Sequence, residues 1–125
     1  MTLKELYDQI GGDYEQAIRV LRMEKLMDKH IRKLTKGGVV EALLAAGETM
    51  DPTQLFETAH AVKGVCGNLG LMKLSAAASE ITEEYRPGST RKFSDSEIGE
   101  KLRDLAALYE QTKAGIAAYE DANAQ

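Results

Sequence analysis

The residues best suited to chemistry lie within residues 53–70, which read TQLFETAHAVKGVCGNLG. His60 is followed by Lys63 and Gly64 three and four residues later, and by Gly67 after almost one more turn. At about 100° per residue, a helix through this segment gathers the apolar residues in a sector about 100° wide: Leu55, Val62, Val65, Cys66 and Leu69. His60 points away from that sector. The pattern predicts a helix with one side buried in a core and an exposed histidine on the other side, one turn from a cation.

This arrangement favours one kind of reaction. An exposed imidazole is largely in its neutral, nucleophilic form at pH 7, so a ring nitrogen of His60 can accept a phosphoryl group. Lys63 would then lie beside the new negative charge. Each glycine inside a helix costs about 0.5–1 kcal/mol relative to alanine, and Gly64 and Gly67 are explained if another molecule must approach the helix closely beside His60.

Two residues about one turn before His60 fall on the same side of the helix. Phe56 and Glu57 are candidates for contact with whatever docks there. Glu57 could also hydrogen-bond the second ring nitrogen of His60 and fix its tautomer; the alternative is a plain solvated carboxylate.

Other chemistries find little support in the chain. Two histidines and one cysteine do not form a zinc site at recognisable spacing, so we expect no metal site. No Gly-rich nucleotide-binding loop occurs, so the chain is expected to be no ATP-dependent enzyme and to need no cofactor of its own. Cys66 and His60 lie on opposing faces, which argues against a Cys–His pair, and Cys66 is interpreted as a buried small hydrophobe.

The composition is that of one domain over residues 1–125, with a core bundle over about residues 13–120. At 125 residues, 43% of them hydrophobic, the chain is long enough to bury a core. No run approaches the roughly 18 apolar residues of a membrane span, and the N-terminus lacks the apolar stretch of a signal peptide. A single cysteine excludes an intramolecular disulfide. We therefore expect a cytoplasmic protein that does not bind membranes.

Capping residues and glycines divide the first half of the chain into helices. A capping box at Thr2 starts a short helix. Asp13 caps a longer helix, predicted to run without a break over residues 13–34 because apolar residues recur at spacings of three and four: Ala17, Val20, Met23, Met27, Ile31 and Leu34. A further short helix is predicted over residues 39–46, with Gly47 as its stop.

The second half of the chain carries clearer signals. Asp51 caps the central helix, with Pro52 at its first position. The next helix covers residues 71–86 and ends before a Pro-Gly loop. A second capping box at Ser94 starts a long helix with apolar spacings of four and three: Ile98, Leu102, Leu105, Tyr109, Thr112, Ile116 and Tyr119. No strand pattern occurs. The predicted fold class is all-α, an up-and-down antiparallel four-helix bundle with one or two additional short helices.

Charge is distributed unevenly along the chain. The whole chain carries −4, whereas residues 19–36 carry +5 and the other residues together −9. Five basic residues follow helical spacing and form one predicted stripe: Arg22, Lys25, Lys29, Arg32 and Lys36. The stripe is either a solvated helix face or, through Arg22, Lys25 and Lys29, a docking surface for an acidic partner. Nucleic acid is not expected as a partner, because aromatic residues do not interleave with these charges.

Residues 60–70, HAVKGVCGNLG, resemble the signature of histidine-containing phosphotransfer (HPt) domains. In that family a histidine is followed by lysine at three and glycine at four, with Asn, Leu and Gly further on. The resemblance extends to the order of helices over roughly residues 13–119, although only the region around the histidine is specific. It implies a monomer that carries a phosphoryl group on histidine between aspartates of response-regulator receiver domains, downstream of a sensor or hybrid histidine kinase.

Carried onto this chain, the resemblance makes His60 the phosphorylated residue. Lys63 would stabilise the phosphoryl group, and Gly64 and Gly67 would give access to it. The receiver domain would supply Mg²⁺ and most of the catalysis. The natural start at Met1 favours a free-standing protein over a piece of a hybrid kinase.

Two other interpretations stay open. A helical adaptor that binds proteins without phosphotransfer would leave His60 incidental, but it offers no reason for the glycines beside it. A sensor kinase's dimerisation and phosphoacceptor domain would place His60 on a homodimeric hairpin before an ATP-binding domain. The lysine–glycine pair after His60 points away from that class.

Overall fold

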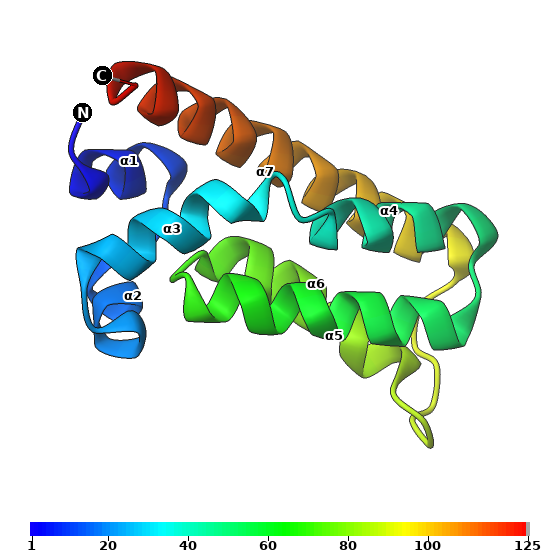
Figure 1. Ribbon diagram of the computed structural model, residues 1–125. Coiled ribbons are helices and arrows are strands. Elements are labelled where there is room, and N and C mark those ends of the chain that lie inside the picture. Colours follow the sequence, from blue (N-terminus) through cyan, green and yellow to red (C-terminus); the bar gives the residue numbers. More distant parts are fainter. Residues whose placement is uncertain (125) are drawn as a thin grey trace.

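Seven helices make up most of residues 1–124, the part of the chain described by this computed structural model (Figure 1). They are α1 (Leu3–Ile10), α2 (Tyr14–Leu21), α3 (Glu24–Leu34), α4 (Val39–Thr49), α5 (Pro52–Asn68), α6 (Met72–Tyr85) and α7 (Asp95–Ala122). Helix α5 packs against α4 and α6, and α7 packs against the same two helices, so these four surround one core. Helix α1 lies beside the C-terminal end of α7. The predicted all-α bundle is confirmed.

The predicted caps are present. Thr2 and Ser94 each form a capping box with the glutamate three residues later. Asp13 and Asp51 accept hydrogen bonds from the backbone of α2 and α5, and Pro52 occupies the first turn of α5. These side chains satisfy backbone N–H groups that have no partner within the helix, which fixes where each helix begins.

The long helix α7 contributes its predicted apolar side to the core. All seven residues of that side are buried: Ile98, Leu102, Leu105, Tyr109, Thr112, Ile116 and Tyr119. Against them α5 buries Leu55, Ala59, Val62 and Cys66. Because one side of α5 is committed to this core, its opposite side is left at the surface.

The C-terminal end of α5 is held by the start of the chain. The Tyr7 hydroxyl donates a hydrogen bond to the Leu69 carbonyl at 2.7 Å, and the Asp13 N–H donates to the Gly70 carbonyl at 2.7 Å. Gly70 has φ +73°, and a Cβ there would collide with the Asp13 carbonyl. Glycine is therefore required at this turn.

The predicted unbroken helix over residues 13–34 is wrong. The chain turns sharply at Arg22, which has φ 75°, and Met23 is extended and caps α3. Val20 and Met23, predicted to be buried, are 42% and 51% exposed. The three-and-four spacing holds within each short helix but cannot reveal the corner between them, because no glycine or proline marks it.

The predicted stop at Gly47 is also wrong. Helix α4 continues to Thr49, and it is one of the four helices around the core rather than a short extra one. A Cβ at Gly47 would lie 2.5 Å from Cδ1 of Leu102. Glycine is present because it lets α4 and α7 approach closely.

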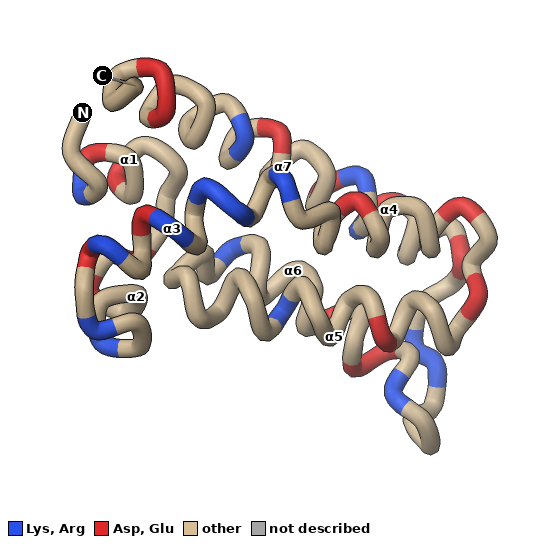
Figure 2. Tube along the Cα trace, viewed as in Figure 1, with Lys and Arg blue, Asp and Glu red and all other residues tan. Residues whose placement is uncertain are grey.

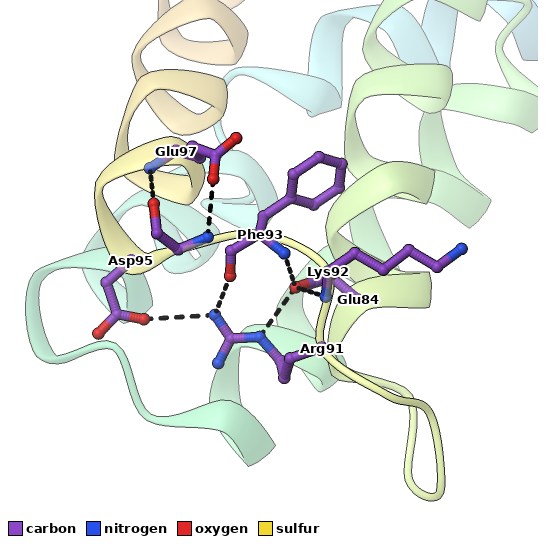
Figure 3. A network of polar contacts seen from close by, with 7 residues as sticks. Glu84, Arg91, Lys92, Phe93, Asp95 and Glu97 are labelled. Carbon is purple, nitrogen blue, oxygen red and sulfur yellow. Dashed lines mark hydrogen bonds and ion pairs between the residues drawn. The ribbon is translucent and has the colours of Figure 1, made fainter.

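A buried carboxylate closes the loop between α6 and α7 (Figure 3). The side chain of Glu84 is 2% exposed and accepts hydrogen bonds from Arg91 Nε at 2.9 Å and from the backbone N–H groups of Lys92 and Phe93 at 2.9 and 2.8 Å. Burial opposes ionisation of Glu84, but these hydrogen bonds outweigh it and hold its pKa below the ordinary value. The loop is therefore tied to the end of α6.

No helix within residues 1–124 is both long enough and apolar enough to cross a membrane.

Replacing Glu84 with Gln should lower the free energy of unfolding by about 1–3 kcal/mol at pH 7, because charge-assisted hydrogen bonds to a buried acceptor are lost. Since the folded-state pKa of Glu84 is lowered, the wild-type advantage should be complete above about pH 4.3 and disappear as the pH falls through the folded-state value. Urea denaturation of both proteins across this pH range measures the difference.

Glu110→Gln is the matched control, because Glu110 pairs with Lys113 at the surface with 70% of its side chain exposed. It should change the free energy of unfolding much less. Equal losses in the two variants would contradict the role given to Glu84.

Candidate functional site

His60 lies on the exposed side of α5, as predicted. Its neighbours Ala59 and Val62 are fully buried on the core side. Cys66 is also fully buried, and burial raises the pKa of its thiol to about 12. A thiol with so little thiolate is a poor nucleophile. The reactive side chain exposed on this helix is therefore the imidazole.

Phe56 stacks against the ring of His60. The ring centroids are 5.8 Å apart and the planes differ by 17°. The guanidinium carbon of Arg86 also lies near this ring, 5.6 Å from the centroid of Phe56. Arg86 directly follows α6, so the site includes a helix that the sequence analysis did not connect with His60.

Glu83, two residues before the end of α6, completes this side of the site. Its carboxylate accepts hydrogen bonds from Nε and Nη2 of Arg86 at 3.0 and 2.8 Å. The hydrogen bond from Arg86 lowers the pKa of Glu83, and positive charge at Arg86, Lys63 and His60 contributes in the same direction. The antiparallel packing of α5 and α6 brings these groups together.

Lys63 is half-buried beside α6. Its backbone carbonyl accepts a hydrogen bond from the Ser75 hydroxyl at 3.0 Å, which ties α5 to α6 at this level. Within residues 1–124 the Lys63 ammonium makes no ion pair, and neither Glu57 nor another residue hydrogen-bonds the His60 ring. The ammonium therefore has no carboxylate partner in this state.

The two glycines differ in their surroundings. A Cβ at Gly64 would meet no atom within 4 Å, whereas one at Gly67 would lie 3.3 Å from the Ser75 hydroxyl oxygen. Packing against α6 supplies a reason for glycine at Gly67. No contact in the described part of the chain supplies one at Gly64.

Val65, predicted to be a core residue, is 39% exposed. It belongs to an open groove of about 360 Å³ where α3 contributes His30, Lys33 and Leu34 and α5 contributes Val65, Asn68 and Leu69. The helical sector places Val65 at the edge of the buried face. The groove therefore adjoins the exposed strip of α5 that carries His60.

The predicted basic stripe is not one surface. Arg32 lies over the ring of Tyr119 and pairs with Glu120 at 3.7 Å, and Lys36 pairs with Glu120 at 3.0 Å, so both point toward α7. Figure 2 shows the remaining positive charge spread over the corner of α2 and α3. There Arg22, Lys25 and Lys29 are exposed, and none of them forms an ion pair within residues 1–124.

Two residues that line the groove, His30 and Lys33, were not assigned to the site from the sequence. Both line the groove beside Val65 and Asn68. The helical position of Lys33, between the buried side of α3 and the solvent side, was the available signal.

Chemically, the arrangement offers an accessible nitrogen nucleophile, a nearby unpaired ammonium and open space above Gly64. A model of the Hpt domain family matches residues 15–115 of the chain. Searches of curated proteins and of solved structures found no match.

Replacing Gly64 with Ala should raise the free energy of unfolding by about 0.5–1 kcal/mol, because alanine is the better helix former and the added methyl group meets nothing. Gly67→Ala should gain less or lose stability, because its methyl group would press on Ser75. Thermal and urea denaturation compare the two. A destabilised Gly64→Ala variant would show that the glycine serves the fold.

Proposed function

The chain belongs to the Hpt domain family, and we propose that it is a histidine phosphotransfer protein that carries a phosphoryl group on His60 between receiver-domain aspartates in a two-component phosphorelay. The observation that carries this proposal is the exposed imidazole of His60, one turn from the unpaired Lys63 and beside the open surface at Gly64. A phosphocarrier needs such a nucleophile within reach of another protein.

The transfer step balances in charge and atoms with only the His60 ring and the aspartyl phosphate as reactants. A lone pair on a His60 ring nitrogen attacks the phosphorus of an aspartyl phosphate. The N–P bond forms as the P–O bond to the aspartate breaks, and the bonding pair leaves with the carboxylate. The second ring nitrogen keeps its proton. Lys63 offsets the charge of the phosphoryl group, and the reverse step passes the group to the next receiver.

The donor must be another protein in this proposal, since the chain carries no nucleotide-binding motif. Upstream, a sensor or hybrid histidine kinase would supply the phosphoryl group through its receiver domain. The Mg²⁺ that phosphoryl transfer requires is expected on the receiver. We propose no cofactor for the chain itself.

We propose that the receiver docks on the exposed strip of α5 and on the adjoining groove. From Ala61 through Gly64 and Val65 to Asn68 this strip is exposed, and the tube of α5 beyond Lys63 is free of charged residues (Figure 2). The groove at its end is apolar with His30 and Lys33 at the rim. An apolar side chain flanked by carboxylates fits that surface.

The cations of the candidate docking stripe would then act at longer range. Arg22, Lys25 and Lys29 lie at the corner of α2 and α3, next to the helix that lines the groove. Exposed cations at this distance raise the rate of encounter with an acidic partner more than they strengthen the complex.

A protein-binding adaptor without phosphotransfer is the second candidate, because the apolar groove could bind a partner even if His60 were chemically idle. The two functions differ in whether the chain ever carries a phosphoryl group.

Incubation with a phosphorylated receiver domain and Mg²⁺ should label the chain with an acid-labile, base-stable phosphoryl group. His60→Gln should abolish the label and leave the circular dichroism spectrum and the denaturation midpoint almost unchanged, because the residue is exposed. His30→Gln, at the chain's other histidine, is the matched control and should retain the label. Label on the His60 variant would refute the assignment.

Replacing Val65 with Glu should weaken binding to the receiver about tenfold or more, or ~1.4 kcal/mol, because it puts a carboxylate into the groove. Met72→Glu is the control, since Met72 is 43% exposed but lies at the start of α6 outside the groove. Isothermal titration calorimetry measures both. Unchanged affinity in the Val65 variant would place the docking surface elsewhere.

A further inference from the structure

We infer that Phe56 is a positioning residue for His60, and that the pair Glu83–Arg86 of the α6 end holds Phe56 in place, so that a row of planar groups fixes the plane of the imidazole. This inference rests on the proposed function, because it concerns the ring that would accept the phosphoryl group.

The rings of Phe56 and His60 stack on each other. Phe56 and His60 are four residues apart on α5, and side chains at this spacing lie one above the other on a helix. Their planes are nearly parallel, at 17°, with centroids 5.8 Å apart. Phe56 is half-buried while His60 is exposed, so the stack joins a ring packed partly against the protein to one at the surface.

Among residues 1–124, no polar group forms a hydrogen bond with the imidazole. Neither ring nitrogen of His60 forms a hydrogen bond within residues 1–124. In many sites a carboxylate or carbonyl fixes the orientation of a histidine. Here the orientation depends on packing, and Phe56 is the aromatic group that packs against the ring.

Phe56 in turn contacts Arg86, the residue that follows α6. The guanidinium carbon of Arg86 lies 5.6 Å from the centroid of Phe56. The Glu83 carboxylate accepts two hydrogen bonds from that guanidinium, at 3.0 and 2.8 Å. Arg86 is the last residue before Pro87, and the loop that follows is tied down by Glu84. The guanidinium over Phe56 is thus held at its tip by Glu83.

A contribution to the free energy of unfolding does not explain why Glu83 and Arg86 are paired. The two side chains are 54% and 42% exposed, and an ion pair in that setting adds little to the free energy of unfolding. Its position against Phe56 gives it a geometric role. The guanidinium can also interact with the face of the phenyl ring, which favours the observed arrangement.

The orientation of His60 matters because the attacking lone pair lies in the plane of the imidazole. Rotation of the ring about its bond to Cβ swings both nitrogens away from a donor. A ring held in one plane meets the phosphorus in a near-attack geometry more often, which raises the rate without tightening binding.

The test uses phosphoramidate, a small donor that phosphorylates imidazole without a receiver. Phe56→Leu keeps an apolar side chain but removes the flat ring, and it should slow labelling of His60 about three- to tenfold. Phe56→Tyr should restore the wild-type rate. Phe93→Leu, at the chain's other phenylalanine, should label at the wild-type rate. A wild-type rate for Phe56→Leu would overturn the inference.

Two further readouts separate positioning from docking and from general damage. The ring-proton chemical shifts of His60 should move in Phe56→Leu and stay in place in Phe56→Tyr, because the shielding by a stacked ring is lost only in the former. Arg86→Gln should slow phosphoramidate labelling in the same direction. A wild-type labelling rate in Arg86→Gln would show that the pair Glu83–Arg86 does not hold Phe56 in place.

With a saturating receiver as donor, so that any change in affinity does not enter the rate, Phe56→Leu should lower the transfer rate. The failure of this inference is distinguishable from failure of the proposed function. If wild-type chain is labelled by phosphoramidate but by no receiver, the relay proposal fails alone. If a receiver labels the wild-type and Phe56→Leu chains equally fast, the positioning role fails alone.

Discussion

Helix α5 is buried along one side and bare along the other, and the rest of the structure depends on this division. Leu55, Ala59, Val62 and Cys66 enter the core formed with α4, α6 and α7. The same helix cannot turn without exposing these residues, so the opposite side is fixed at the surface. Tyr7 and Asp13 hydrogen-bond the backbone at the C-terminal end of α5. The position of His60 is therefore determined by contacts that do not involve His60 itself.

Much of this division could be predicted from local sequence. Caps at Asp51 and Ser94, and the apolar repeat of α7, depend on residues a few positions apart. The exposure of His60 followed from helical spacing alone. The corner at Arg22 could not be predicted, because an arginine in a left-handed conformation has no sequence signal.

The site was predicted less completely than the helix that carries it. Arg86, which is hydrogen-bonded to Glu83, reaches Phe56 only because α6 folds back along α5, and a single helix's periodicity holds no information on its neighbour. The same limit applies to the charges. Arg32 looked like part of one stripe with Lys29, but Asp28 and the ring of Tyr119 draw it toward α7. Which cations face a partner is decided by tertiary contacts.

The central claim is that the chain passes on the group it receives. The most direct measurement is to purify the chain labelled on His60, add an unphosphorylated receiver domain with Mg²⁺, and follow the label. We expect the label to leave the chain and to appear on the receiver as a base-labile acyl phosphate. If the label stays on His60, or is released as inorganic phosphate no faster than without the receiver, while the same receiver accepts phosphoryl groups from a small donor, the chain is not a phosphocarrier for that receiver. The same outcome with every receiver that binds it would contradict the account.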